Sequence, residues 1–236
     1  MSIICEIGQN FSSDLNLAKK LILLAKDNGG DLAKFQLYDT DKLYTPDTEL
    51  YRLAKESELT QEQAQMLFDY GESIGMEVFF SVFDIERVNW CEEIGVKRYK
   101  IASSVEDEDI FFAVYDTHKP VILSHHPFCF RKGGKPISVV GKYMMQDTPD
   151  ETKLYCIPNY PTKLDELELY RLDNYDGFSD HTIGLDCAKI ALARGAKIIE
   201  KHFCISHDVG VDAPWSMDAN ELRELVRWQN VVNQVL

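Results

Sequence analysis

Several features that would mark particular classes of protein are missing from this chain of 236 residues. No apolar run approaches the ~20 residues that a membrane-spanning helix requires, and no signal peptide opens the sequence. Basic residues are scarce, with 25 Lys and Arg against 39 Asp and Glu, so the formal net charge is −14. That balance argues against a surface for nucleic acids or anionic membranes, but a few inward-pointing lysines still suffice for a small anionic substrate. We expect a cytoplasmic protein with neither a nucleic-acid partner nor a membrane partner.

Paired cysteine motifs are also missing. The six cysteines show no CxxC spacing, and most of them lie within apolar stretches. This distribution is typical of reduced thiols in the core of a cytosolic protein rather than of disulfides or a zinc site. The residues concerned are Cys5, Cys91, Cys129, Cys156, Cys187 and Cys204.

Apolar stretches typical of buried strands alternate with amphipathic stretches typical of helices along the whole chain. Continuous apolar strands indicate a parallel sheet that is covered on both faces. We predict strands at 2–8, 32–36, 77–83, 98–103, 120–125, 153–158, 175–179 and 196–203. We predict helices within 12–30, 60–75, 84–95, 105–116, 164–172, 183–194 and 218–234, several of them with Gly or capping-box signals at their ends.

Eight strand–helix units predict an α/β protein that closes into a single (β/α)8 TIM barrel over residues 1–236. An open, doubly wound sheet is the alternative architecture. One unit is irregular, because the residues between the fifth and sixth strands have no clean helical period. Helix 5 is therefore predicted to be short or replaced by a loop.

Polar side chains lie near the carboxyl end of almost every predicted strand, which is where the active site of such a barrel is found. With the two-residue period of a strand, Lys34 and Gln36 share one face, and so do Glu200 and His202. A lysine or glutamate that faces a barrel interior costs several kcal/mol unless it is paired or ligated. We therefore predict one site from Glu6, Lys34, Gln36, Ser81, Lys100, Ser103, Ser124, His125, Asn159, Tyr160, Ser179, His181, Glu200 and His202.

A purely structural explanation exists for each of these residues alone. A histidine at a strand end is often only hydrogen-bonded, a serine there often caps a helix, and Lys34 and Lys100 can pair with Glu6 and Glu200. Two histidines on adjacent strands, each with a carboxylate beside it, favour a shared metal ion instead.

The motifs occur in a familiar order: CEIGQN, LAKFQ, FFSVFD, YKIASS, PVILS, YPT, FSDHTIG, IEKHF and MDANEL. In this order the chain resembles the sialic acid (N-acetylneuraminate) synthase family over about residues 2–234. The resemblance implies an enzyme that condenses phosphoenolpyruvate with the open-chain aldehyde of an N-acylated sugar. The products would be a 2-keto-3-deoxy sugar acid of the nonulosonic type and phosphate.

The resemblance also implies roles for individual residues. His181 and His202 match ligands of a divalent cation, usually Mn²⁺, with Mg²⁺ or Co²⁺ as alternatives. Glu6 matches a glutamate near the acceptor, and Glu6 or Glu200 would position or deprotonate the attacking water. Tyr160 and Asp212 match residues at the sugar and metal end. The contacts to phosphoenolpyruvate match Lys34, Ser81, Lys100, Ser103, Ser124 and Ser179.

The sequence departs from the family pattern in several places. Phe11 replaces a histidine, Pro158 replaces a phosphoenolpyruvate contact for which Asn159 is a substitute, and His125 and His126 replace a Gly-Met pair. Family members continue into an antifreeze-like domain that supplies an arginine to the partner's acceptor site in a swapped dimer, whereas this sequence ends at Leu236. Either a homodimer or a separate chain that carries the domain is therefore an expected partner.

Two other functions compete with a synthase. The changes at Phe11 and Pro158 favour a non-catalytic relative that binds a sugar or a phosphate. The pair His125 and His126 favours a metal-dependent lyase or isomerase on the same barrel.

Overall fold

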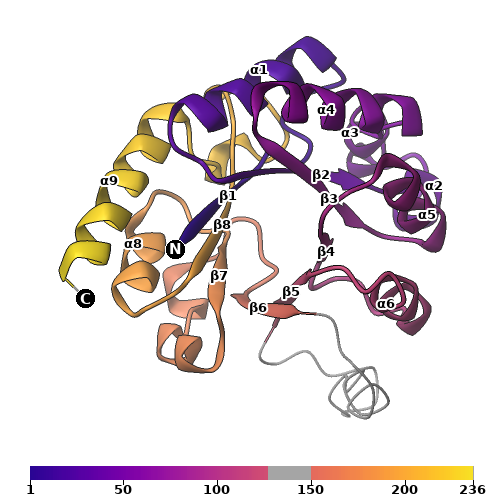
Figure 1. Ribbon diagram of the computed structural model, residues 1–236. Coiled ribbons are helices and arrows are strands. Elements are labelled where there is room, and N and C mark those ends of the chain that lie inside the picture. The colour runs from indigo at the N-terminus through magenta and orange to yellow at the C-terminus, as the bar shows by residue number, and fades with distance from the viewer. Residues whose placement is uncertain (127–149, 236) are drawn as a thin grey trace.

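Eight parallel strands close into a barrel in the order in which they occur along the chain. The computed structural model describes residues 1–126 and 150–235, and within them each strand pairs with the next while β8 pairs with β1. Figure 1 shows the strands at the centre and the helices on the outside. The predicted barrel is confirmed, and the open sheet is wrong. The strands are β1 (Ser2–Glu6), β2 (Leu32–Leu37), β3 (Glu77–Val82), β4 (Tyr99–Ile101), β5 (Val121–His125), β6 (Glu151–Cys156), β7 (Gly177–Asp180) and β8 (Ile198–His202).

The helices fall largely where the apolar periodicity predicts them. The predicted capping box of Thr60 and Gln63 begins α4, and Gly75 ends it in the left-handed conformation. The described α-helices are α1 (Leu15–Asp27), α2 (Thr40–Leu43), α3 (Glu49–Glu56), α4 (Gln61–Ile74), α5 (Ile85–Ile94), α6 (Glu108–Tyr115), α8 (Asp186–Ala193) and α9 (Ala219–Val235). No helix of the described residues is long and apolar enough to cross a membrane.

Two predictions for the connections after β5 and β6 have different outcomes. The helix predicted at 164–172 is wrong, because this segment forms two short 3₁₀ helices, η1 (Leu164–Glu166) and η2 (Leu169–Asn174). Its apolar side chains Leu169 and Leu172 are three residues apart, which is the period of a 3₁₀ turn. The irregular helix 5 and Cys129 fall within residues 127–149, outside the described residues.

The barrel interior changes from apolar to polar along its axis. A small apolar cluster fills the lower part, with Ile4, Leu32, Phe79, Ile122 and Leu154 buried and Ile198 packed against them. Two residues farther along the same strands, on the same face, come the polar residues Glu6, Lys34, Ser81, Ser124 and Glu200. The apolar cluster closes the barrel below, so the polar layer forms the floor of a cavity that opens at the carboxyl ends.

Candidate active site

The structure brings the predicted site residues, with the exception of His125, to one cavity at the carboxyl ends of the strands. The cavity has a volume of about 540 Å³, which is within the range of small-molecule sites. Its wall includes fourteen predicted residues: Glu6, Lys34, Gln36, Ser81, Lys100, Ser103, Ser124, Asn159, Tyr160, Ser179, His181, Glu200, His202 and Asp212. Their location agrees with the sequence; their individual roles stay predictions.

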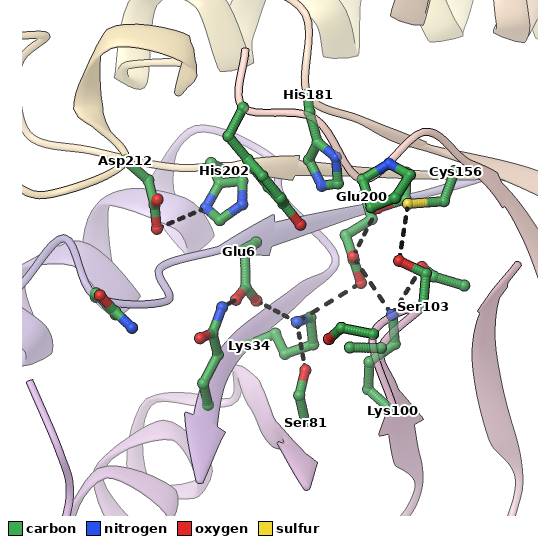
Figure 2. Close-up of a pocket in the computed structure, with 18 of the residues that line it drawn as sticks. Glu6, Lys34, Ser81, Lys100, Ser103, Cys156, His181, Glu200, His202 and Asp212 are labelled. Carbon is green, nitrogen blue, oxygen red and sulfur yellow. Dashed lines mark hydrogen bonds and ion pairs between the residues drawn. The ribbon is translucent and has the colours of Figure 1, made fainter. Parts of the chain in front are cut away.

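Two buried lysines and two buried glutamates form a continuous charge network at the cavity floor (Figure 2). The Lys34 ammonium contacts Oε2 of Glu6 at 2.5 Å and Oε2 of Glu200 at 3.8 Å. The Lys100 ammonium lies 3.7 Å from Oε1 of Glu200. Each ammonium also donates to a serine hydroxyl, Lys34 to Ser81 at 2.7 Å and Lys100 to Ser124 at 2.8 Å. The pairing that the sequence allowed is present, and it faces a cavity rather than a packed core.

The environment moves the pKa values of the two glutamates in opposite directions. Burial raises the pKa of Glu6, although Lys34 opposes the rise. Burial acts in the same sense on Glu200, but Lys100 and Lys34 together outweigh it, so that pKa lies below its ordinary value. Burial lowers the pKa of Lys100, with Glu200 opposing. The floor therefore holds an ionised carboxylate at Glu200 beside a carboxyl at Glu6 that takes up a proton more readily.

The two histidines face each other across one side of the cavity, with ring centroids 5.6 Å apart. The Nδ1 of His181 lies 2.9 Å from the carbonyl oxygen of Ile157, which favours a ring that donates from Nδ1. Burial lowers the pKa of His181, but Cys156 and the Ile157 carbonyl outweigh it, so that this pKa lies above its ordinary value. The Nδ1 of His202 lies 3.3 Å from Oδ2 of Asp212, without the alignment of a hydrogen bond. Burial, and next the neighbouring His181, lower the pKa of His202 well below its ordinary value, so this imidazole is neutral.

A buried asparagine that the sequence reasoning missed holds Asp212 in place. Oδ1 of Asn10 accepts a hydrogen bond from the backbone N–H of Asp212 at 2.9 Å, while its amide donates to the Phe203 carbonyl at 3.0 Å. Gly210 allows this close approach, because a Cβ there would lie 2.4 Å from Oδ1 of Asn10. Burial, followed by the charge of Glu6, raises the pKa of Asp212 to about 7.

Further residues shape the cavity or line its wall, and several of them lie within the quoted motifs although they were not predicted as site residues. Gly8 has a φ of +52°, and a Cβ there would lie 3.1 Å from Oε1 of Glu6, so this position favours glycine for two reasons. Tyr160 lies over His181, with the ring centroids 4.2 Å apart. The residues that were not predicted are Gln9, Tyr44, Leu50, Phe83, Ala102, Ser104, Cys156, Pro158, Val211 and Trp215. Val211 and Trp215 could have been predicted as wall residues because they lie close in sequence to Asp212. The sequence held no comparable signal for Tyr44 and Leu50.

One cysteine differs from its predicted role. The five described cysteines are free and buried, as expected, but Cys156 also forms part of the cavity wall. Its thiol lies 3.6 Å from Oγ of Ser103 (Figure 2). The description of Cys156 as a core thiol is therefore incomplete, because the inward face of β6 reaches the cavity at this residue.

The positions that depart from the family pattern have different locations. Phe11 is buried against Phe35, so it fills the core and does not line the cavity. Pro158 lines the cavity, whereas the amide of neighbouring Asn159 donates to Glu166 at 3.0 Å. His125 contacts the Tyr175 hydroxyl at 3.0 Å, and neither His125 nor His126 is among the described wall residues.

A second group of potential metal ligands lies away from the cavity, at the start of α9. Ligand atoms of His207, Asp218 and Glu221 all lie within 4.8 Å of one another. The two carboxylates are already used in the capping box that begins α9, where Asp218 accepts from the Glu221 backbone and Glu221 accepts from the Asp218 backbone. This group is explained by the helix cap.

Comparison with known proteins assigns the family. Residues 21–236 match the NeuB family. The chain belongs to the NeuB family. It is 31% identical to the N,N'-diacetyllegionaminic acid synthase of Legionella pneumophila, with 95% of this chain and 70% of that protein covered. It is 28% identical to the human N-acetylneuraminate-9-phosphate synthase, with 99% and 70% covered.

A solved structure of a related protein has the same fold and supports this family assignment. The N-acetylneuraminic acid (sialic acid) synthetase of Leptospira borgpetersenii superposes with a TM-score of 0.88 at 29% identity, covering 99% of this chain and 84% of that one. The predicted resemblance to the sialic acid synthases is confirmed, and with it the prediction of an enzyme of that class.

Proposed function

We propose that this NeuB-family protein condenses phosphoenolpyruvate with the open-chain aldehyde of an N-acylated hexosamine or related sugar. The proposal rests mainly on two buried lysines, surrounded by serine hydroxyls, that share one cavity with a histidine pair. The products are a 2-keto-3-deoxy sugar acid of the nonulosonic type and phosphate.

The cavity floor suits the donor substrate. Phosphoenolpyruvate carries a phosphate and a carboxylate, and each is bound well by an ammonium together with hydroxyl donors. Lys34 and Lys100 supply two cations, while Ser81, Ser103, Ser124 and Ser179 supply hydroxyls. In the free site the two lysines face two glutamates, so their charges cancel. An incoming anion therefore competes with Glu6 and Glu200 for the ammonium groups.

The residues present fit a divalent cation. Nδ1 of His181 faces the Ile157 carbonyl, which leaves Nε2 as the ligand atom, while His202 is held neutral and the Asp212 carboxylate lies beside it. Two imidazoles and a carboxylate suit a first-row transition-metal ion better than Mg²⁺, which prefers an all-oxygen site. When bound, such a cation supplies Lewis acidity toward the acceptor carbonyl oxygen. We propose Mn²⁺, held by His181 and His202 with Asp212 beside them.

The two glutamates have pKa values suited to different tasks in the reaction. The enol carbon C3 of phosphoenolpyruvate forms a bond to the aldehyde carbon, and Glu6, at the acceptor side, delivers a proton to the aldehyde oxygen. Water then adds to C2, where positive charge develops, and Glu200 takes the proton of that water. The tetrahedral carbon then collapses: the C2 hydroxyl oxygen becomes the keto group, its proton passes to the departing phosphate, and the bond from C2 to the bridging oxygen breaks. Lys34 and Lys100 hold the phosphate and carboxylate through both steps.

Two features of the setting belong to the same proposal. The free, buried cysteines agree with a reducing compartment, so we assign the protein to the cytoplasm. Recognition of the acyl group at the cavity mouth is assigned to Tyr160 and its aromatic neighbour Trp215, whose ring centroids are 5.9 Å apart. A second chain that completes this end of the site, either another copy or one carrying an antifreeze-like domain, remains a prediction.

The test is release of phosphate that depends on the acceptor. The protein is incubated with phosphoenolpyruvate and Mn²⁺, with and without a panel of N-acylated hexosamines and plain aldoses. We expect phosphate only when a suitable aldose is present, and a loss of turnover of about 10²- to 10⁴-fold in the Glu6→Gln variant. Binding of phosphoenolpyruvate without phosphate release from any acceptor would favour the non-catalytic binding protein. Turnover of a sugar without phosphoenolpyruvate would favour the lyase or isomerase.

A further inference from the structure

A fully buried ion pair lies directly behind the two histidines, on the outer face of the barrel wall. Asp180 is the last residue of β7 and Lys201 the penultimate residue of β8, and the two are register partners in the sheet. The Lys201 ammonium lies 3.1 Å from Oδ2 of Asp180, and both side chains have no solvent exposure. Neither residue lines the cavity.

The pair also holds the residue that follows His181. Oδ1 of Asp180 accepts from the Thr182 backbone N–H at 2.8 Å and from the Thr182 hydroxyl at 2.7 Å. The Lys201 ammonium donates to the Thr182 carbonyl oxygen at 2.7 Å. His181 is thus flanked on both sides by residues that are tied to Lys201. Lys201 is in turn the direct neighbour of His202.

The hydrogen bonds that the ring and the backbone of His181 make with Ile157 and Thr162 tie it to the connection after β6. Its Nδ1 lies 2.9 Å from the Ile157 carbonyl, and its own carbonyl accepts from the Thr162 N–H at 3.0 Å. These contacts fix His181 relative to the end of β6. Its position relative to β8, and hence to His202, depends on the pairing of β7 with β8 and on Lys201 with Asp180.

Stability alone does not explain a buried ion pair at this place. Removing two charges from water is costly, and replacing such a pair by well-packed apolar side chains is often neutral or stabilising. The pair does provide directional contacts, which apolar side chains lack. Directional contacts fix the backbone on which the two histidines stand. Partners that hydrogen-bond metal ligands directly alter metal affinity by about 10- to 100-fold, which sets the scale for an effect through the backbone.

We propose that Asp180 and Lys201 are positioning residues that fix the spacing and orientation of His181 and His202 through the backbone, and so set the affinity and geometry of the metal site. The inference rests on the proposed function, in which those histidines hold the cation. It extends the site to two residues that touch neither substrate nor metal.

The experiment replaces the ion pair by an apolar pair in the full chain. The double variant Asp180→Leu, Lys201→Met removes the directional contacts and keeps the volume filled. A control removes a partly exposed ion pair at the amino end of the barrel, between Glu77 of β3 and Arg98 directly before β4, by Arg98→Met with Glu77→Leu; there Nε and Oε1 are 2.6 Å apart. Mn²⁺ affinity is measured from the electron paramagnetic resonance signal of free Mn²⁺, and ligand geometry from the visible spectrum of the Co²⁺ form.

We expect the double variant to be folded, as a cooperative unfolding transition would show. It should bind Mn²⁺ at least about tenfold more weakly than the parent and have a different Co²⁺ spectrum. The control is expected to keep both properties of the parent. A folded double variant with parental Mn²⁺ affinity and an unchanged Co²⁺ spectrum overturns the inference, and so does an equal loss in the control.

Two further variants keep the result interpretable. If the double variant does not fold, Asp180→Asn keeps the shape and the contacts to Thr182 but weakens the contact to Lys201, and a smaller loss of Mn²⁺ affinity is expected; no loss overturns the inference. His181→Asn separates the two proposals. If the His181→Asn variant binds Mn²⁺ as tightly as the parent does, the metal assignment itself is wrong. Binding that depends on His181 but not on Asp180 and Lys201 defeats only the positioning role.

Discussion

Replacing Lys100 by methionine should weaken phosphoenolpyruvate binding while leaving the fold intact. Lys100 is 1% exposed, and the Lys100→Met change keeps its apolar stem but removes a cation that donates to Ser124 at 2.8 Å. Glu200 keeps Lys34 as a charge partner at 3.8 Å and a hydrogen bond from Ser179 at 3.0 Å, so it is not left alone in the interior. A hydrogen bond to a charged group contributes about 1.5–3 kcal/mol, so the Kd for phosphoenolpyruvate should rise about 10- to 150-fold.

Thermal unfolding with and without phosphoenolpyruvate measures this change. At a concentration of about 100 times the parental Kd, the parent gains about 2.7 kcal/mol. A variant with a Kd about 40-fold higher gains only about 0.7 kcal/mol under the same conditions. For a domain of this size, the rise in Tm should fall from about 5 °C to about 1.5 °C. The exposed Lys97, paired with Glu72 at 2.8 Å, is the matched control, and Lys97→Met should behave as the parent does. An unchanged rise in Tm for Lys100→Met would refute the assignment of this lysine to the donor site.

Three other predictions address the rest of the cavity. The pKa of Asp212 is about 7 in the folded protein and about 3.8 in the unfolded chain. Between these values the folded protein holds a proton that the unfolded chain has lost. The metal-free protein should therefore lose up to a few kcal/mol of its free energy of unfolding as pH rises through this window. The Asp212→Asn variant should lack that slope in urea titrations at successive pH values. Leu154→Ala removes a side chain from the buried apolar cluster below the cavity and should lower the free energy of unfolding by about 2–5 kcal/mol in the same titrations. A loss below about 1 kcal/mol would contradict tight packing of this cluster. Gly8→Ala should cost about 1–2 kcal/mol and reduce turnover, since it combines a positive φ with a Cβ 3.1 Å from Glu6; parental turnover would contradict the second part.

The barrel and most of its cavity were predictable because two periodicities coincide in the sequence. The strand period of two places Ile4 and Glu6, or Ile198 and Glu200, on one face, and the order of apolar before polar along each strand indicates where the cavity opens. Parallel strands then bring all carboxyl ends to one rim. Residues close together in space but far apart in sequence, such as Lys34 and Glu200, were therefore predictable as a group before any distance was known.

Other features depend on contacts that no local pattern encodes. Tyr44 and Leu50 reach the cavity because the segment with α2 and α3 folds over its mouth. This segment is mostly polar in sequence, so no apolar period indicated where it would pack. Asn10 holds Asp212 across about two hundred residues of sequence. The 3₁₀ helices after β6 were predicted as one α-helix because leucines three residues apart fit both periods over so short a segment.

The most direct test of the condensation at C2 is the fate of solvent oxygen. The reaction is run in ¹⁸O-labelled water with phosphoenolpyruvate, Mn²⁺ and an N-acylated hexosamine that supports phosphate release, and both products are examined by mass spectrometry at early times. Since water adds to C2 and the C2–O bond breaks, we expect the label in the sugar acid and unlabelled phosphate. Label in the phosphate, with no new bond between the donor and the sugar, would mean hydrolysis at phosphorus and would contradict the proposed function.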